Sequence, residues 1–98
     1  MNNVKDLVAK QGNVELELEI VELGMMREFS KFGNVGKVLT AVAQDKTGKI
    51  NLTLWNEQTD LVKVGDKVRL TNGYVNEWQG EKQLTTGRNG TLEVISRK

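Results

Sequence analysis

The sequence predicts an all-β domain in which a small antiparallel sheet closes on itself into a barrel. Apolar and polar residues alternate in several short runs along the 98 residues, as expected of half-buried strands. Ten glycines and no prolines leave glycine to make the turns. Only one short segment reads as a helix. Closure removes the exposed edges of such a sheet, and we expect residues 1–98 to form one domain around one core.

The first half of the chain predicts two strands and a hairpin turn. In Asn13–Leu23 aliphatic residues alternate with glutamates, so one face is buried and the other carries carboxylates. The segment MMREFSKF between Gly24 and Gly33 is expected to be a ribbon or a loop. Residues 36–44 form the second strand, which is apolar on both faces, so its inward side stays open. Asp45-Lys46-Thr47-Gly48 has the composition of a hairpin turn.

The third strand, Lys49–Trp55, has an unusual distribution of side chains. Its even-numbered positions are aliphatic and form a core face, whereas Asn51, Thr53 and Trp55 point the other way. The largest apolar side chain of the strand therefore lies on the polar face.

The second half predicts a short helix and further strands. Asn56 is placed to cap a helical segment at residues 57–62. A fourth strand runs from Val68 to Trp78, a turn follows at residues 79–81, and Lys82–Thr86 form a fifth strand. A last short strand is expected at Leu92–Ile95. The order β-β-β-α-β-β is that of the OB-fold, a five-stranded Greek-key barrel. An SH3-like barrel is the main competitor, but it would not need the insert at residues 56–64.

Composition narrows the function classes. The chain has no cysteine and no histidine, which removes thiol chemistry, disulfides and the commonest general base and metal ligand. The acidic residues are scattered, so we expect no enzyme, no metal and no cofactor. No apolar run approaches the roughly 20 residues that span a bilayer, and the N-terminal residues predict no secretory signal. We therefore expect no membrane partner and an intracellular location.

The net charge of +1 is unevenly distributed. Residues 1–24 carry two basic and five acidic side chains, residues 25–49 five basic and two acidic, and residues 50–98 seven and six. This pattern fits either a polar surface field or scattered solvated charge.

None of the five aromatic residues lies at a clearly inward position. Phe29 and Phe32, with Met25 and Met26, fit either a hydrophobic plug under a loop or a ligand contact. Trp55 points outward by alternation. The fourth strand holds the remaining two, Tyr74 and Trp78, which share one face with Asn76 between them.

The two aromatics of the fourth strand raise a question of parity. Val68 and Leu70 are also even-numbered, so an unbroken strand would turn both rings toward the core. Either the rings fill a tapering end of the barrel, or the strand slips by one residue and turns them outward while Val75 takes the core position. Asn72-Gly73 is where a slip would occur, because a glycine within a strand often marks a bulge that requires φ > 0.

Exposed aromatics on adjacent strands usually mark a binding site. Unpaired nucleobases fit flat rings with polar neighbours, since each base can stack on an aromatic for roughly 1–3 kcal/mol. Bases in a duplex are already stacked and fit poorly. The phosphates that accompany the bases call for cations, and the candidates are Arg27, Lys31, Lys37, Lys82 and Arg88, each of which is also explained as a solvated surface charge.

The sequence resembles the short single-stranded DNA-binding proteins of archaea and their eukaryotic relatives, which have one OB-fold. The resemblance covers residues 4–94. It rests on Val4-Lys5-Asp6-Leu7, on Asp45-Lys46-Thr47-Gly48-Lys49-Ile50 with Leu52-Thr53-Leu54-Trp55, on Gly65-Asp66 with Val68-Arg69-Leu70, on Asn72-Gly73-Tyr74 and on Thr86-Gly87-Arg88.

The resemblance implies that bases stack on Trp55, Tyr74 and Trp78, and that Arg27 and Phe29 contact the strand. Three features depart from the family pattern. Many members have a proline where this chain has Val8-Ala9-Lys10, and some have a further aromatic in the fifth strand, where Leu84-Thr85-Thr86 offers none. Members often continue into a partner-recruiting tail, whereas this sequence stops at Lys98.

The resulting hypothesis is a non-enzymatic OB-fold that binds single-stranded DNA with little sequence preference, in replication, recombination or repair. The expected stacking residues are Trp55, Tyr74, Trp78 and Phe29. The expected phosphate contacts are Arg27, Lys37, Lys82 and Arg88. The expected polar groove residues are Asn51, Thr53 and Asn76. An RNA-binding OB module and a protein-interaction OB subunit of a larger complex are the alternatives.

Overall fold

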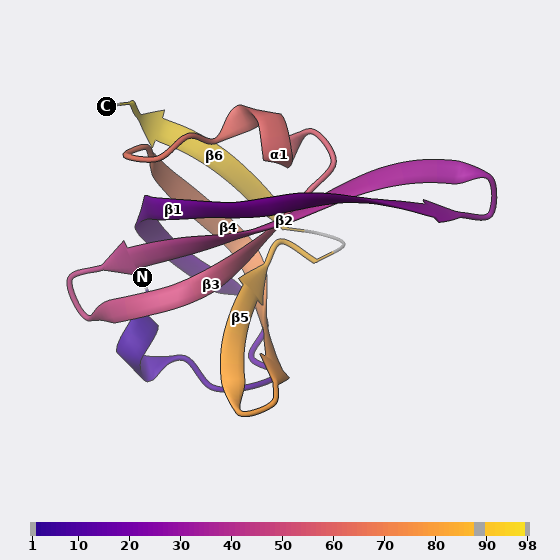
Figure 1. The fold of residues 1–98 in the computed structure, drawn as a ribbon. Coiled ribbons are helices and arrows are strands. Elements are labelled where there is room, and N and C mark those ends of the chain that lie inside the picture. Colours follow the sequence, from indigo (N-terminus) through magenta and orange to yellow (C-terminus); the bar gives the residue numbers. More distant parts are fainter. Residues whose placement is uncertain (1, 88–89, 98) are drawn as a thin grey trace.

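The computed structural model describes residues 2–87 and 90–97 and consists mainly of strands (Figure 1). In chain order the elements are a 3₁₀ helix η1 (Val4–Asp6), β1 (Val14–Lys31), β2 (Asn34–Asp45), β3 (Gly48–Trp55), the short helix α1 (Gln58–Leu61), β4 (Lys67–Trp78), β5 (Glu81–Thr85) and β6 (Thr91–Ser96).

The strand pairings form a ring. The order within the sheet is β1-β2-β3-β5-β4-β6, and β1 also pairs with β4, so the first five strands return to their starting point. The β3–β5 pair is parallel and the other pairs are antiparallel. The sixth strand, at the site predicted for a last short strand, adds to β4 outside the ring. The predicted all-β OB-fold architecture, with its helix between β3 and β4, is confirmed.

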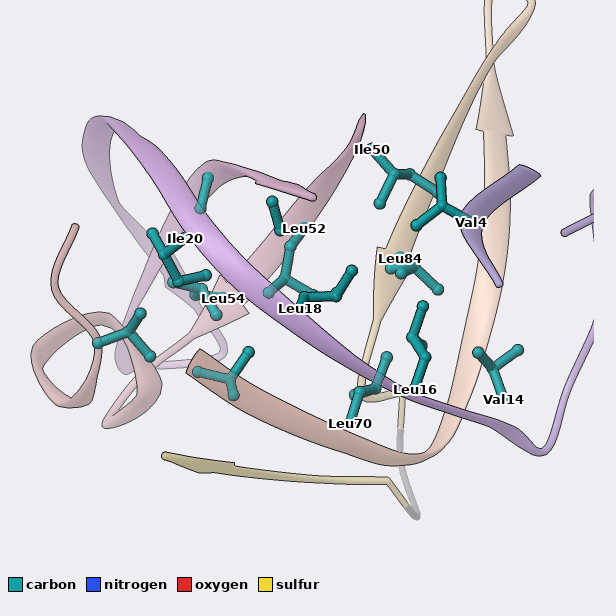
Figure 2. Packing of buried hydrophobic residues seen from close by; sticks show 14 of the residues in the cluster. Val4, Val14, Leu16, Leu18, Ile20, Ile50, Leu52, Leu54, Leu70 and Leu84 are labelled. Atoms are coloured by element: carbon teal, nitrogen blue, oxygen red, sulfur yellow. The ribbon is translucent and has the colours of Figure 1, made fainter. Parts of the chain in front are cut away.

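The core inside the ring is aliphatic (Figure 2). It contains even-numbered residues of β1 and β3, as alternation predicts; they are Val14, Leu16, Leu18 and Ile20 of β1 and Ile50, Leu52 and Leu54 of β3. The inward side of β2, left open by the sequence, consists of Leu39, Ala41 and Ala43. Within the described residues, no aromatic side chain belongs to this core. The rings are therefore free to lie on the outer face of the sheet.

An N-terminal segment that the sequence analysis did not assign covers one end of the ring. Val4, the first residue of η1, and Leu7, which follows η1, are both buried against the core. Asp45 fixes this segment, because one carboxylate oxygen accepts the N–H of Val4 at 3.0 Å while the other accepts the N–H groups of Thr47 and Gly48. The same carboxylate thus closes the predicted hairpin turn and holds η1 against it.

The segment between Gly24 and Gly33 is a strand, so of the two expected forms the ribbon is confirmed. β1 continues through it, and its pairing with β2 extends out to Lys31 and Asn34 at a two-residue turn. This hairpin arm, residues 24–37, projects from the body of the molecule (Figure 1). The hydrophobic-plug interpretation is wrong, because Met25 is 86% exposed and Phe32 is 93% exposed.

Asn56 does not cap α1 as predicted. The N-cap residue is Glu57, which makes no capping hydrogen bond through its side chain. Asn56 instead adopts a left-handed conformation with φ of 51°, and its side-chain oxygen accepts the N–H of Lys37 at 3.2 Å. Asparagine tolerates this conformation better than most residues, which explains its place at the exit of β3.

The predicted slip in β4 is confirmed. Leu16 pairs with Leu70 and Val14 pairs with Gly73, so a two-residue step on β1 faces a three-residue step on β4. Val68, Leu70 and Val75 are all fully buried. A bulge between Leu70 and Gly73 therefore reverses the parity of the strand and turns its later even-numbered residues outward.

The expected role of Gly73 in this bulge was wrong in one respect. The residue with positive φ is Asn72, at 56°, and not Gly73. Gly73 is needed for space, because a β-carbon there would lie 2.6 Å from Cδ2 of the buried Leu70. The bulge thus uses two neighbouring residues, one for its conformation and one for its small size.

Candidate functional site

A groove of about 570 Å³ lies on the outer face of the sheet, where β2, β3, β5 and β4 follow one another and the base of the arm rises beside them. Its lining residues come from all five strands of the ring. They are Gly24, Met25, Arg27, Val38, Thr40, Thr53, Trp55, Asn76, Trp78, Gln83 and Thr85.

Trp55 forms one end of the groove and is held on two sides. The side chain follows Leu54 at the end of β3 and is 40% exposed, as its parity predicted. Its indole N–H donates a hydrogen bond of 3.0 Å to the Thr85 hydroxyl. Phe29 meets the indole edge-on, with ring centroids 6.1 Å apart and planes at 83°, which is a favourable aromatic arrangement.

Trp78 forms the opposite end of the groove. It is the last residue of β4, pairs with Glu81 at the start of β5, and is 65% exposed. Because β5 runs parallel to β3 and antiparallel to β4, the ends of β3 and β4 point in opposite directions. The two indoles therefore bracket the groove with polar side chains between them.

Polar side chains on the outer face of the sheet, in and beside the groove floor, lie in rows across the strands. Asn51, Gln83 and Asn76 are consecutive partners across β3, β5 and β4, and Thr53 pairs with Thr85 in the next row. Of the residues predicted here, Thr53 and Asn76 line the groove, and Asn51 is on the same face of β3 just outside it.

The sequence analysis missed Thr40, Gln83 and Thr85. The alternation of the fifth strand around the buried Leu84 could have identified the last two, because Gln83 and Thr85 must point away from the core.

The remaining predicted aromatics lie beside the groove. Phe29 is 39% exposed and touches Trp55 rather than lining the groove; its ring packs over Gly36, where a side chain would collide with it. Tyr74 is half-buried and lines a smaller adjoining hollow of about 260 Å³ together with Asn13 and Gly87.

The four predicted phosphate contacts do not come together. Arg27 lines the groove. Lys37 lies 3.8 Å from the carboxylate of Asp60, and the ammonium of Lys82 donates to the backbone carbonyl of Leu7 at 2.6 Å. Arg88 lies outside the described residues. A cation that the analysis overlooked is Lys49, which shares the outward parity of Asn51 on β3 and is exposed.

No group of three or more carboxylates is placed to hold a metal ion in residues 2–87 and 90–97. No helix in this part of the chain is long and apolar enough to cross a membrane. The groove thus offers flat rings, amides, hydroxyls and one guanidinium, which suit binding.

Comparison with known proteins places the chain in a family. A family model described as single-stranded DNA binding protein Ssb-like, OB fold, matches residues 4–94. The single-stranded DNA binding protein Ssb of Saccharolobus solfataricus is 26% identical over 84 residues, covering 86% of this chain and 57% of that protein. Replication factor A of Methanothermobacter thermautotrophicus is 32% identical over 84 residues, covering 85% of this chain and 10% of that protein.

A solved structure agrees with these relatives. The crystal structure of a domain of replication protein A from Methanococcus maripaludis superposes with a TM-score of 0.79 at 28% identity, covering 98% of this chain and 96% of that one. This chain therefore spans only part of the length of the two curated relatives but nearly all of a single domain. From the fold, the outward aromatics and the match over residues 4–94, the chain belongs to the Ssb-like family of OB-fold single-stranded DNA-binding proteins.

Proposed function

We propose that this chain binds single-stranded DNA in the groove between Trp55 and Trp78, with little preference for sequence and without catalysis. The observation that carries the proposal is the placement of two exposed indoles at opposite ends of one groove with a neutral polar floor. Bases of any identity present a π-face to such rings. Duplex DNA cannot do so without unstacking its bases.

The residues divide into three roles in this proposal. Trp55 and Trp78 stack bases, and Tyr74 extends the path into the adjoining hollow. Arg27 neutralises a phosphate at the arm side of the groove. The amides and hydroxyls in and beside the floor contact base edges and sugars; they are Thr53, Asn76, Thr40 and Gln83 in the floor and Asn51 beside it.

The biological setting we propose is the protection of exposed strands during replication, recombination or repair. Its support is the family match and the similarity to a protein named replication factor A. Because this chain covers 10% of that protein, the proposal concerns the binding module and carries over no assembly from the relative.

The test is a titration of tryptophan fluorescence with oligo-dT. Stacked bases should quench the indoles, and Trp78→Ala should weaken binding by about 1–3 kcal/mol. Since Trp78 is 65% exposed, the substitution should leave the melting temperature unchanged. Val64→Ala, which shortens an exposed apolar side chain outside the groove, serves as the matched control and should bind as wild type does.

Two other outcomes would redirect the proposal. Tighter binding of oligo-U than of oligo-dT would favour the RNA-binding module, because the 2′-hydroxyl is what distinguishes the two sugars. Absence of binding to any oligonucleotide at low salt would favour the protein-interaction subunit, with the same indoles as its hot spot.

A further inference from the structure

We propose that Thr85 is a positioning residue for Trp55, fixing the indole as a platform and withdrawing its only hydrogen-bond donor from the ligand. This inference rests on the proposed function. The sequence analysis mentioned Thr85 only as part of the fifth strand, where some members of the family have a further aromatic residue and this chain has none.

The contact that carries the proposal is built into the sheet. Thr85 is 8% exposed and pairs with Thr53 of β3 and with Tyr74 of β4. Both neighbouring strands therefore fix its backbone. Its hydroxyl oxygen accepts the indole N–H of Trp55 at 3.0 Å and the backbone N–H of Gly87 at 3.3 Å. With two donors on one oxygen, both of its lone pairs are in use.

This contact determines what Trp55 can offer a ligand. The indole N–H is the only hydrogen-bond donor of a tryptophan side chain, and the ring has no acceptor. Because Thr85 takes that donor, Trp55 can contribute only ring surface. Stacking on a ring surface tolerates every base, so Thr85 makes this end of the groove insensitive to base identity.

The contact also orders the ring before a ligand arrives. A free indole on the surface would lose rotamer freedom on binding, and this loss of conformational entropy lowers the affinity. A ring already held by Thr85 and Phe29 avoids much of this loss. Removal of the hydroxyl should therefore weaken binding mainly by speeding dissociation.

The test compares Thr85→Val, which keeps the β-branched shape and removes the acceptor, with Thr85→Ser, which keeps the acceptor. Thr91→Val is the control, since it removes a hydroxyl from an exposed position of β6 outside the groove and leaves the indole contact intact. In the free protein, the Trp55 indole proton should exchange slowly with water in wild type and Thr85→Ser, and faster in Thr85→Val. This readout does not depend on any ligand.

With oligo-dT, Thr85→Val should bind about 3- to 10-fold more weakly, the range expected for one hydrogen bond, while Thr85→Ser and Thr91→Val stay near wild type. In a Trp55→Ala background Thr85→Val should have no further effect on affinity. Thr85→Val should also bind homopolymers of the four bases less evenly than wild type, because the freed donor can then read a base edge. Two results would overturn the inference. One is an equal exchange rate of the Trp55 indole proton in wild type and Thr85→Val, and the other is a loss of affinity on Thr85→Val that persists in the Trp55→Ala background. Wild type that binds no DNA, with the exchange difference intact, would overturn the proposed function and leave the positioning contact standing.

Discussion

At the scale of single residues, the bulge in β4 decides which side chains face the groove. Asn72 supplies the left-handed conformation and Gly73 the space beside Leu70. Without the extra residue, Tyr74 and Trp78 would point into the ring with Val68 and Leu70. The bulge therefore decides whether these two aromatic side chains are buried in the core or lie on the surface.

Gly73→Ala tests this close packing. The new β-carbon would lie 2.6 Å from Cδ2 and 2.8 Å from Cγ of Leu70, so the core must shift. We expect a loss of about 1–3 kcal/mol in the free energy of unfolding, the usual cost of overpacking, measured by chemical denaturation. Gly12→Ala is the matched control, because nothing lies within 4 Å of a β-carbon there. Equal stability of the two variants would show that Gly73 is not needed for space.

At the scale of elements, the strands and turns were predictable and their long-range partners were not. Alternation identified the inward faces of β1 and β3, because the two-residue period can be recognised within the sequence of each strand alone. The length of the arm was ambiguous, because residues 25–32 lie beyond the core. No face of this segment is buried, so its sequence lacks the alternation of apolar and polar residues that would identify a strand. The contact of η1 with the β2–β3 turn joins residues more than 40 positions apart, which local patterns do not reveal.

That contact gives a prediction on pH. Partial burial disfavours the charged form of Asp45, but hydrogen bonds from the Thr47 hydroxyl and from the N–H groups of Val4, Thr47 and Gly48 outweigh it and hold its pKa below the ordinary value. A lowered carboxyl pKa in the folded state means stability that is present above the ordinary aspartate pKa and is lost as the pH falls through the lowered one.

Asp45→Asn should therefore be less stable than wild type by about 1–2 kcal/mol at neutral pH, as expected for hydrogen bonds to a charged group. The difference should shrink as the pH falls below the ordinary aspartate pKa, because wild type then loses the same charge. Urea denaturation of both proteins across this pH range measures it. A difference that stays constant down to the most acidic condition would contradict the assigned role of the carboxylate.

At the level of the whole molecule, the basic side chains near the groove are not the ones expected from the sequence. Lys37 and Lys82 are engaged by Asp60 and by the Leu7 carbonyl, whereas Arg27 lines the groove and Lys49 shares its side of the sheet. Parity predicted which aromatic and amide side chains face outward beside the groove. Which basic side chains lie near the groove was not predictable, because loops and strand ends have no period that fixes the direction of a side chain.

This division predicts a shallow salt dependence of binding. Each phosphate contact of a single strand contributes a slope of about −0.7 in log K against log salt. Two contacts, at Arg27 and Lys49, give about −1.4, against about −3 for the four cations expected from sequence. Arg27→Ala should flatten the slope by about 0.7, while Lys37→Ala should leave it unchanged. A slope near −3 that Lys37→Ala flattens would place the strand over the α1 side instead.

If single-stranded DNA lies in the groove between the two indoles, it does not touch the glutamates of β1. Chemical-shift mapping by NMR with oligo-dT tests this placement. We expect the largest shifts at the indole N–H groups of Trp55 and Trp78 and at Asn76, Gln83 and Thr85. The backbone signals of Glu17, Arg69 and Glu93, which are paired across β1, β4 and β6 and do not line the groove, should not move. Shifts concentrated at Glu17, Arg69 and Glu93, with both indoles unaffected, would contradict it.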